Sequence, residues 1–391
     1  MEVKRKPIEF YSTQSINRND KKSVIDALSS DFLSRGPKIQ AFEKKIGKWC
    51  DNKWVVVVNS GTSALQLAYQ VSGVKKGSLV WTTPLTFAAT ANAAVALGAE
   101  IDFVDIDPET LNLCPALLEE KLKDAKKKSK LPDCLTVVHF AGNPCEMEKF
   151  FSLSRRYKFK IIEDASHALG AYYKESPIGS NEYSDISIFS FHPVKMITTG
   201  EGGALLLSSK NEFELADSLR SHGMVTPSRT GSTKKPMWYY EQQYLGNNYR
   251  MSELQAALGL SQMKRLGEFV KKRNELADIY SESLEKMPIK TQTILENNLS
   301  SYHLYTIEIL DKKFSRDDLY LYLKKNGIGC QVHYMPVHMH PFYIRKGFKK
   351  GFFENSEAYF ETCLSVPLHQ GLKKKDVLEV CSKLEQFFRK K

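Results

Sequence analysis

The sequence lacks the cysteine pairs that would mark a disulfide framework or a zinc site. Its seven cysteines lie far apart along the 391-residue chain, and none belongs to a CxxC motif. Cysteines scattered in this way are typical of free thiols in a reducing compartment. We therefore expect a cytoplasmic protein with neither disulfides nor a bound metal.

Also missing is any apolar run long enough to cross a bilayer, which takes about 20 residues. The stretch FAATANAAVALGAEI leans apolar, but it is shorter than that and rich in alanine. The first residues, MEVKRKPIEFYSTQ, are charged and contain no apolar segment of the kind found in secretory signals. We expect no membrane partner.

Negative charge is in the minority, with 45 acidic against 56 basic residues and a formal net charge of +11. A basic protein favours an anionic partner, such as a phosphorylated small molecule. Part of the surplus lies in the lysine-rich runs KLKDAKKKSK and FFRKK, which are typical of solvated surface. Aromatic-interleaved basic stripes and zinc-finger spacings are absent, so we expect no nucleic-acid partner.

Short apolar segments alternate with helical patterns through the first half of the chain. The apolar runs are continuous, as in WVVVVNS and GGALLLS. Such strands with helices between them indicate an α/β protein with a mostly parallel sheet covered on both faces. The expected strands are 54–60, 78–84, 100–107, 134–142, 158–165, 185–191 and 202–208, and two of the expected helices are 62–73 and 87–98.

The last third of the chain has a different character. Residues 249–287 read as one long helix that begins near Ser252, with Glu253 in its first turn. A strand at 301–310, a helix at 315–327 and a strand at 328–334 follow and predict a smaller α+β domain. We divide the chain into a large domain, 1–255, and a small C-terminal domain, 256–391.

The first chemical motif is VVVVNSGTSALQLA, in which an apolar strand leads into a helix through Gly61. Free backbone N–H groups and the helix dipole at such a start suit a phosphate, with the Thr62 and Ser63 hydroxyls as further donors. Ser and Thr also serve as plain helix caps without a ligand. Taken alone, the motif leaves both interpretations open.

The second motif, KFKIIEDASHALGA, places Glu163 and Asp164 at the end of an apolar strand. Ligands of open α/β sheets lie beyond the carboxyl ends of the strands, so Asp164 is well placed to meet one. His167 follows and could share that site. The alternative is that Asp164 only caps the next helix.

The third motif is SFHPVKMITTGEGGALLL, which surrounds Lys195 with small and polar residues. A lysine in a partly dry pocket loses its proton more easily and can form a Schiff base. Such a lysine together with an aspartate under the ring nitrogen is the pattern of pyridoxal phosphate enzymes. Ser190 could donate to the phosphate, and Phe87 could stack on the ring, although the default place for Phe87 is the core.

Seven stretches resemble, in chain order, the motifs of the DegT/DnrJ/EryC1/StrS sugar aminotransferase family. They are NSGTSALQLA, TTPLTFAATANA, VHFAGNPCEME, IIEDASHALGA, SFHPVKMITTGEGG, LRSHGM and NYRMSELQAALGLSQ. The likeness extends from about residue 8 to the C-terminus. It implies a fold-type-I pyridoxal phosphate enzyme with a mixed, mostly parallel sheet, a smaller C-terminal domain and a homodimeric assembly.

The resemblance implies a role for each matching position near the cofactor ring. Lys195 would hold the cofactor as a Schiff base and shuttle protons, and Asp164 would pair with the ring N–H. His167 falls where the family has Gln or His near the phenolic oxygen. Phe87 falls at the aromatic residue that stacks on the ring.

The resemblance also implies how the cofactor's phosphate would be held. Thr62, Ser63 and Ser190 fall at phosphate-binding positions of the family. Asn248, in GNNYR, falls where the second subunit reaches over to the same phosphate. Each active site would then need both chains of a homodimer.

A narrower likeness concerns the branch of the family that serves pseudaminic acid biosynthesis. LSRGPKIQAFE, SSYHLYTIEIL and GIGCQVHYMPVHMHPFY resemble this branch. The branch implies L-glutamate as amino donor, released as 2-oxoglutarate, and C4 of UDP-2-acetamido-2,6-dideoxy-β-L-arabino-hex-4-ulose as acceptor. Relatives that act on dTDP- or GDP-linked 4-keto-6-deoxy sugars share most of these stretches, so those acceptors stay open.

Lys195 and Asp164 also bear on two alternative functions found on the same fold, a dehydratase and a regulatory protein. Dehydratases of the family resemble this chain but have His in place of the lysine. A non-catalytic regulatory protein would be expected to lose Lys195 or Asp164. Both residues are present, which favours the aminotransferase.

The segment QVHYMPVHMHPFY carries His333, His338 and His340 close together. Three histidines can bind zinc, but no acidic or cysteine ligand stands at a matching spacing. We favour a loop that faces the substrate, with Tyr334 near the sugar or the nucleotide, over a metal site.

Overall fold

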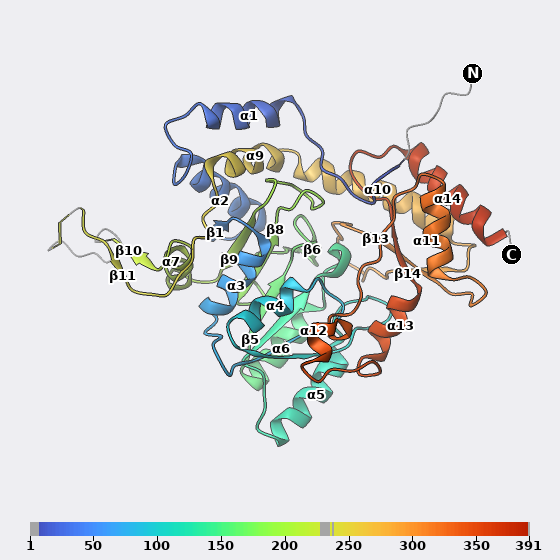
Figure 1. Cartoon of the computed structure of the whole chain (residues 1–391), viewed down its shortest axis with the longest axis horizontal. Helices are drawn as coiled ribbons and strands as arrows, with labels where there is room; N and C mark the ends of the chain where they lie inside the picture. The colour runs from blue at the N-terminus through green and yellow to red at the C-terminus, as the bar shows by residue number, and fades with distance from the viewer. Residues whose placement is uncertain (1–7, 227–234, 237, 390–391) are drawn as a thin grey trace.

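The computed structural model describes residues 8–226, 235–236 and 238–389 (Figure 1). At its centre lies a seven-stranded sheet with the strand order β1-β9-β8-β5-β4-β2-β3. The strands are β1 (Trp54–Val58), β2 (Leu79–Thr82), β3 (Glu100–Phe103), β4 (Cys134–Val138), β5 (Lys160–Asp164), β8 (Ile186–Ser190) and β9 (Gly203–Leu207).

The sheet is mixed but mostly parallel, which confirms the predicted fold class. The strands β3, β2, β4, β5 and β8 pair in parallel, whereas β9 pairs antiparallel with both β8 and β1. Since neighbouring parallel strands end at the same edge of a sheet, β5 and β8 bring their last residues, Asp164 and Ser190, to one edge. Ligands of open α/β sheets bind beyond this edge.

Each face of the sheet packs against its own layer of helices. In β1, Val55 and Val57 belong to the core on one face, while Val56 and Val58 belong to the core on the other. All four side chains are buried, because successive residues of a strand point to opposite faces. This double burial explains why the strands are continuous apolar runs.

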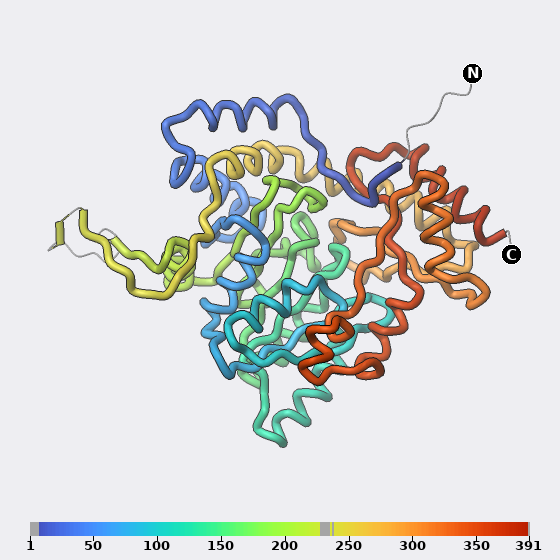
Figure 2. Tube along the Cα trace, viewed as in Figure 1, coloured from blue at the N-terminus to red at the C-terminus, as the bar shows by residue number. Residues whose placement is uncertain are grey.

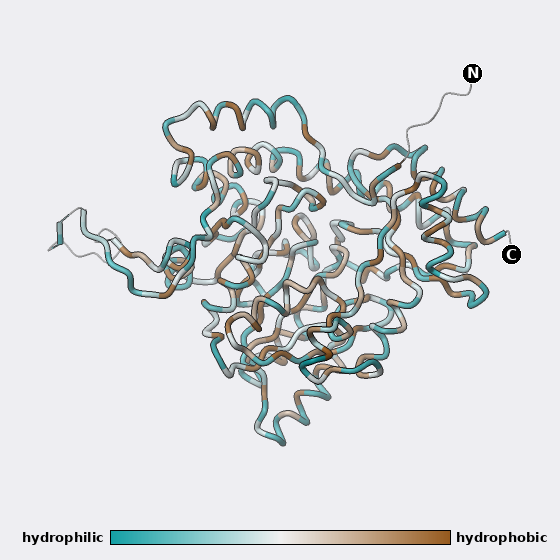
Figure 3. Tube along the Cα trace, viewed as in Figure 1, coloured by the Kyte–Doolittle hydropathy of each residue, from teal (hydrophilic) through white to brown (hydrophobic). Residues whose placement is uncertain are grey.

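Helices from distant parts of the chain form the two layers. The face with Val55 is covered by α2 (Pro37–Cys50), α5 (Pro115–Lys127) and α6 (Met147–Tyr157), and the face with Val56 by α3 (Gly61–Val71), α4 (Ala89–Ala96) and α7 (Lys210–Leu219). α1 (Arg18–Leu28) packs outside, on α9 (Glu253–Met263). Along outer helices such as α5, hydrophobic and hydrophilic residues alternate within the turns (Figure 3), as expected for helices with one buried face.

A smaller unit is built on a three-stranded antiparallel sheet with the order β12-β13-β14. Three helices pack on this sheet around a core of their own. Its elements are β12 (Ile289–Thr291), β13 (Tyr305–Ile309), β14 (Cys363–Val366), α10 (Leu266–Leu284), α11 (Arg316–Lys325) and α14 (Lys374–Arg389).

Short elements complete the described chain. Between α11 and β14, the segments η2 (Val337–Met339), α12 (Pro341–Ile344) and α13 (Glu354–Thr362) return to pack on the large unit. The others are η1 (Phe140–Gly142), the pair β6 (Tyr172–Tyr173) and β7 (Ser176–Pro177), and the pair β10 (Met224–Val225) and β11 (Glu241–Gln242). The β10–β11 pair forms an arm that projects from the body (Figure 1).

α10 connects the two hydrophobic cores. Leu266 and Val270 pack in the core of the large sheet, whereas the residues from Leu276 onward belong to the core of the small sheet. The change of core therefore falls within α10, beyond the predicted boundary. The division into domains 1–255 and 256–391 stays a prediction.

The single long helix predicted for 249–287 is wrong, because the structure has two helices, α9 and α10. Ser252 is the N-cap of α9, as expected, and forms a capping box with Gln255. At the other end, Lys264 and Arg265 donate to carbonyls three residues back, which tightens the last turn and ends α9. No Pro stands at this break, and Gly267, two residues after Arg265, lies inside the first turn of α10 rather than at the end of α9. The sequence pattern therefore does not show where α9 ends.

The strand predicted for 328–334 is also wrong. Ile328 makes one isolated bridge with Ile8, and Gln331 makes another with Ser365. The segment passes between the N-terminal stretch and β14 and pairs once with each, so no continuous ladder forms.

The N-terminal stretch joins the two units. From residue 8 it runs beside the small unit before it reaches α1 (Figure 2). The backbone N–H groups of Gly329 and Leu368 donate to the carbonyls of Ile8 and Tyr11.

All seven cysteines are free. Among the described residues, no helix is both long and apolar enough to cross a membrane.

Candidate active site

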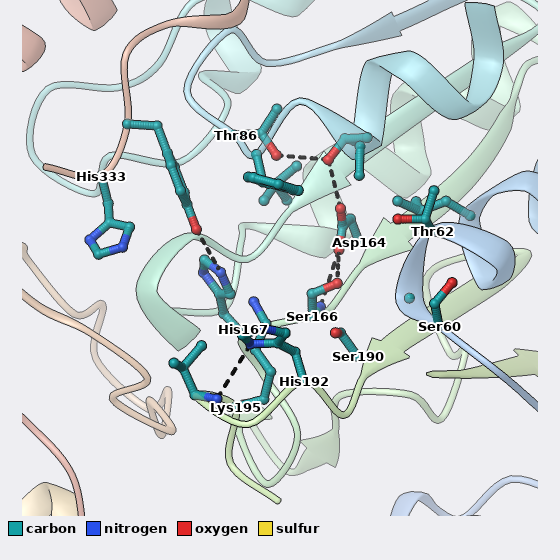
Figure 4. A pocket seen from close by; sticks show the side chains of 18 of the residues that line it. Ser60, Thr62, Thr86, Asp164, Ser166, His167, Ser190, His192, Lys195 and His333 are labelled. Carbon is teal, nitrogen blue, oxygen red and sulfur yellow. Dashed lines mark hydrogen bonds between the residues drawn. The ribbon is translucent and has the colours of Figure 1, made fainter. Parts of the chain in front are cut away.

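A cavity of about 600 Å³ lies beyond the carboxyl ends of β5 and β8. Its walls come from the start of α3, the loop before α4, the turn that contains Lys195, and residues 331–334 of the small unit. In Figure 4, Ser60, Thr62 and Ser190 lie on one side of Asp164, and His333 lies on the other. Segments far apart in the sequence thus meet in one site.

The start of α3 provides an anion-binding corner of this cavity. Ser60 is the N-cap, and its hydroxyl accepts from the backbone N–H of Ser63 at 3.1 Å. The Ser60 carbonyl accepts the N–H of Ala64, the first hydrogen bond of the helix. The N–H groups of Gly61 and Thr62 come before it and have no acceptor in the described chain. Unpaired N–H groups at a helix start attract an anion.

Ser190 closes the same corner from the end of β8. A Cβ atom added to Gly61 would lie 2.8 Å from Ser190 Cβ and 3.0 Å from its Oγ. Only glycine therefore lets the helix start approach this hydroxyl. Thr62 and Ser190 both line the cavity.

Ser63 does not reach the cavity in this structure. Its hydroxyl donates to Asn59 Oδ1 at 2.7 Å and lies 2.8 Å from Ser60 Oγ. Ser60 stands at the cavity wall instead. The sequence signal for Ser60 was its place just before the glycine at the helix start, which is the usual place of an N-cap.

Asp164 is buried at the end of β5, with its carboxylate held by hydroxyl groups. Its Oδ1 accepts from Ser166 Oγ at 2.6 Å and from Ser166 N at 3.2 Å. Its Oδ2 accepts from Thr90 Oγ1 at 2.7 Å. No sequence pattern marks Thr90 or Ser166 as partners of this acid.

Lys195 is half-buried at the cavity wall and lies in a turn that follows β8. Burial lowers the pKa of its amino group to about 8, against an opposing pull from the Asp164 carboxylate. A substantial share of the amine is therefore neutral near physiological pH. A neutral lysine amine is a nucleophile and a base, as the sequence pattern predicts.

Phe87 is exposed over 62% of its surface, although it lies in a helix-start pattern whose default place is the core. Its ring lines the cavity, and its centre lies 6.2 Å from the centre of the Tyr334 ring. An exposed aromatic ring at a cavity wall is available to stack on a flat ligand.

His167 lines the cavity beside Tyr334, and its Nε2 lies 3.2 Å from the Tyr334 hydroxyl. Its ring also packs on that of His303, with 4.3 Å between their centres. Burial, and then the positive charge of Lys195, lower the pKa of His167 well below its usual value. The ring is therefore neutral, and its buried Nδ1 has no hydrogen-bond partner.

The three histidines of the 333–340 segment are not gathered around one point. His333 lines the cavity and contacts Ser365 Oγ through Nδ1 at 2.8 Å. His338 is fully buried and contacts Glu357 at 2.8 Å. No cluster of three metal-ligating side chains occurs in residues 8–226, 235–236 and 238–389.

Asn248 lies away from the cavity of its own chain. Its side chain is exposed, and its backbone bridges to Ser221 at the base of the β10–β11 arm. Its carbonyl accepts from Asn59 Nδ2 at 3.3 Å. On this exposed surface, Asn248 is accessible to a second chain.

The donor set of the cavity fits pyridoxal phosphate. The helix start with Thr62 and Ser190 suits its phosphate, and the buried Asp164 carboxylate suits a protonated ring nitrogen. The partly neutral Lys195 amine suits its aldehyde. His167 lines the same wall, and its buried Nδ1 has no hydrogen-bond partner in the described chain.

The sequence matches the profile of the DegT/DnrJ/EryC1/StrS aminotransferase family over residues 14–385. A UDP-4-amino-4,6-dideoxy-N-acetyl-beta-L-altrosamine transaminase of Campylobacter jejuni is 40% identical over 368 residues, which cover 94% of each chain.

Solved structures agree with the sequence match. PseC of Helicobacter pylori, an aminotransferase involved in the biosynthesis of pseudoaminic acid, superposes with a TM-score of 0.88 at 31% identity, over 97% of this chain and 99% of its own. The PLP form of the putative sugar aminotransferase Spr1654 of Streptococcus pneumoniae gives 0.87 at 26% identity, over 98% and 99%. These likenesses indicate a PLP-dependent enzyme.

Proposed function

Because this chain belongs to the DegT/DnrJ/EryC1/StrS aminotransferase family, we propose that it moves the amino group of L-glutamate to C4 of a UDP-linked 4-keto-6-deoxy sugar. The proposed acceptor is UDP-2-acetamido-2,6-dideoxy-β-L-arabino-hex-4-ulose, and the donor leaves as 2-oxoglutarate. The names of the Campylobacter and Helicobacter relatives support this acceptor. The structural observation that carries the proposal is the meeting of Lys195, Asp164 and the α3 start at one cavity.

Pyridoxal phosphate is the proposed cofactor, and the residues that would hold it come from three sides of the cavity. When bound, it supplies an aldehyde that takes up amino groups and a protonated ring that accepts electrons. Thr62, Ser190 and the N–H groups at the start of α3 would bind its phosphate. Ser63 remains a predicted phosphate ligand, although its hydroxyl points to Asn59 here.

Lys195 is the proposed proton carrier. Its amine would hold the cofactor covalently at rest and, once displaced by the donor, would take a proton from one carbon and return it to another. Such a base works best when its pKa lies near the working pH, and burial brings the pKa of Lys195 to about 8. Lys195→Ala should abolish both the covalent attachment and turnover.

The other side chains orient the flat ring and exclude water from it. Asp164 would accept the ring N–H, since its carboxylate is buried at the sheet edge. Phe87 would stack on one face of the ring, and the neutral His167 would donate to or accept from its phenolic oxygen. His333 and Tyr334 line the same cavity, and they would contact the sugar or the nucleotide.

The proposed assembly is a homodimer with shared active sites. Asn248 is a predicted phosphate ligand, yet it lies on an exposed surface outside its own cavity. A second chain would bring the partner's Asn248 to the phosphate bound here. A monomeric variant would then bind the cofactor weakly and have no activity.

A mass-spectrometric screen tests the proposed reaction. The protein is incubated with L-glutamate and UDP-, dTDP- or GDP-linked 4-keto-6-deoxy sugars, and the amino sugar and 2-oxoglutarate are measured. We expect product with the UDP-linked acetamido sugar and none with Lys195→Ala. If product forms only with a dTDP- or GDP-linked sugar, that sugar is the acceptor and the proposed UDP-linked one is wrong. If no product forms with any of the three sugars, the proposed reaction is contradicted.

A further inference from the structure

A chain of buried hydroxyl groups ends on the Asp164 carboxylate. Thr90 Oγ1 donates to Asp164 Oδ2 at 2.7 Å, and Thr86 Oγ1 lies 2.8 Å from Thr90 Oγ1. Thr90 is fully buried and Thr86 is 3% exposed, so little water competes for these contacts. In Figure 4 the dashed contacts lead from Thr86 to Asp164 and on to Ser166.

The direction of donation along this chain follows from the number of protons. A threonine hydroxyl has one proton, and Thr90 gives its proton to the carboxylate. Thr86 must therefore be the donor in its contact with Thr90. Hydrogen bonds that point the same way polarise one another, so Thr86 strengthens the bond that Thr90 makes.

Both oxygens of Asp164 are fixed by hydroxyl donors, Oδ2 by Thr90 and Oδ1 by Ser166. Hydrogen bonds to an ionised acceptor are among the stronger ones in proteins. Together the hydrogen bonds from Thr90 and Ser166 fix the rotation of the Asp164 carboxylate about its Cβ–Cγ bond. Oδ1 already accepts two hydrogen bonds from Ser166, whereas Oδ2 accepts one from Thr90 and keeps acceptor capacity for one more donor.

We propose that Thr90, supported by Thr86, is a positioning residue that holds the Asp164 carboxylate in the orientation in which it accepts the ring N–H of the cofactor. This inference rests on the proposed function. It adds to the predicted site Thr86 and Thr90, which lie in the stretch TTPLTFAATANA on either side of Phe87. Thr90 acts through Asp164 and needs no contact of its own with the ring.

The Thr90 hydroxyl is not needed to hold its own helix. The Thr90 carbonyl accepts from the Tyr69 hydroxyl at 2.8 Å, and this backbone contact survives replacement of the side chain. Valine has nearly the shape of threonine, so Thr90→Val removes the donor and keeps the packing. Thr90→Ser keeps the donor.

The test measures ligand binding rather than turnover, with cofactor-free protein and two probes. One is pyridoxamine phosphate, and the other is its analogue in which a C–H group replaces the ring nitrogen. Thr90→Val should weaken binding of pyridoxamine phosphate by about tenfold, the size expected for a hydrogen bond to a charged group. Thr90→Val should bind the analogue as tightly as the unaltered protein does. Thr90→Ser, which keeps the donor, should bind both probes as tightly as the unaltered protein.

Two further variants keep the result interpretable. Thr136→Val is the matched control, since Thr136 is a fully buried threonine that contacts the Tyr69 hydroxyl and not Asp164; both affinities should stay unchanged. If Thr90→Val does not fold, Thr86→Val tests the same chain one step further away, with a smaller loss confined to pyridoxamine phosphate.

Equal losses for both probes would reduce Thr90 to a packing residue and overturn the inference. Unchanged binding of pyridoxamine phosphate by Thr90→Val would overturn it as well, while the proposed function stands. If the unaltered protein binds neither probe, the proposed function fails and the inference fails with it.

Discussion

Glu163 and Asp164 are adjacent acids at the end of β5, yet the pleat of the strand gives them different surroundings. Asp164 faces the cavity, whereas Glu163 is held by His139 at 2.7 Å and by Ser187 at 3.0 Å. His139 accepts the Cys145 N–H through Nδ1, so its Nε2 carries the proton that it donates to Glu163. The two acids therefore have separate roles, one toward a ligand and one within the fold.

Replacing Glu163 with Gln tests the structural role. Burial raises the pKa of Glu163, but its hydrogen bonds, led by the one from His139, outweigh burial and lower the pKa below 4.5. The carboxylate thus stabilises the fold above that pH, and the contribution disappears as the pH falls through the lowered value. We expect Glu163→Gln to cost about 1–3 kcal/mol at pH 7 in urea unfolding, and less in acid.

Glu148→Gln is the matched control, because the Glu148 carboxylate pairs with Lys174 at an exposed site. It should change the free energy of unfolding much less than Glu163→Gln does, because water screens an exposed ion pair. Equal effects of the two substitutions would show that the buried contacts of Glu163 contribute no more than a surface pair.

The pH dependence of cofactor uptake tests Lys195. Only the neutral amine attacks an aldehyde, and burial lowers the pKa of Lys195 from 10.5 to about 8. The rate of covalent attachment to cofactor-free protein should therefore rise with pH and level off above about 8. Stopped-flow absorbance measures this rate, and a midpoint near 10 would mean that the amine is fully hydrated.

The sequence could predict the chemistry of the site residues but not every direction in which they point. Lys195, Asp164, His167, Phe87 and Thr62 line one cavity, and their roles toward a cofactor stay predictions. Ser63 points into the loop before α3, because a side chain on the first helical turn can face the cap as well as the ligand. No local pattern distinguishes these two directions.

At the scale of elements, a side chain of α9 caps the start of α2. The Glu253 carboxylate accepts the backbone N–H of Lys38, which lies 215 positions earlier in the sequence. The buried Glu253 carboxylate accepts from the N–H groups of Gly36, Lys38 and Ile39 at 3.0, 2.8 and 3.2 Å. Gly36, the N-cap of α2, has no side chain for this purpose. A carboxylate from another helix thus caps α2 and complements its dipole.

Glu253→Gln should therefore destabilise the protein by about 1 kcal/mol, since the neutral amide has one acceptor oxygen for three donors. Glu268→Gln, in the exposed first turn of α10, is the control and should have an effect of about 0.5 kcal/mol or less. Thermal unfolding of the two variants compares them. Equal stabilities would contradict the capping role.

The elements that the sequence predicts best are those that local patterns define. The strands of the large sheet and the N-cap Ser252 are placed within a few residues. The break at Lys264–Arg265 comes from a tightened last turn of α9, which hydrophobic periodicity does not show. The missing strand at 328–334 depends on single bridges to the N-terminal stretch and to β14, which lie far away in the sequence.

At the scale of the whole molecule, the N-terminal stretch links the small unit to the turn that holds Lys195. Ser12 Oγ donates to the Val194 carbonyl at 3.0 Å and lies 3.4 Å from Arg273 Nη2. Arg273 is fully buried in α10 and its Nη1 donates to three carbonyls. Burial lowers the pKa of this guanidinium to about 9.

Ser12→Ala should loosen this link. We expect a loss of about 1 kcal/mol in the free energy of unfolding, because the Val194 carbonyl loses its donor. Thr13→Ala is the control, since the Thr13 hydroxyl contacts only the neighbouring, exposed Gln14. If both variants unfold at the same temperature as the unaltered protein, the Ser12 contact does not couple the two units.

The central claim is that this cavity holds pyridoxal phosphate on Lys195, and one measurement tests it most directly. The protein is loaded with pyridoxal phosphate, reduced with borohydride to fix the link, digested, and its peptides are mapped by mass spectrometry. The account predicts a single modified residue, Lys195, in the peptide around SFHPVKMITTGEGG. A modified lysine elsewhere in the chain, or none, would contradict it.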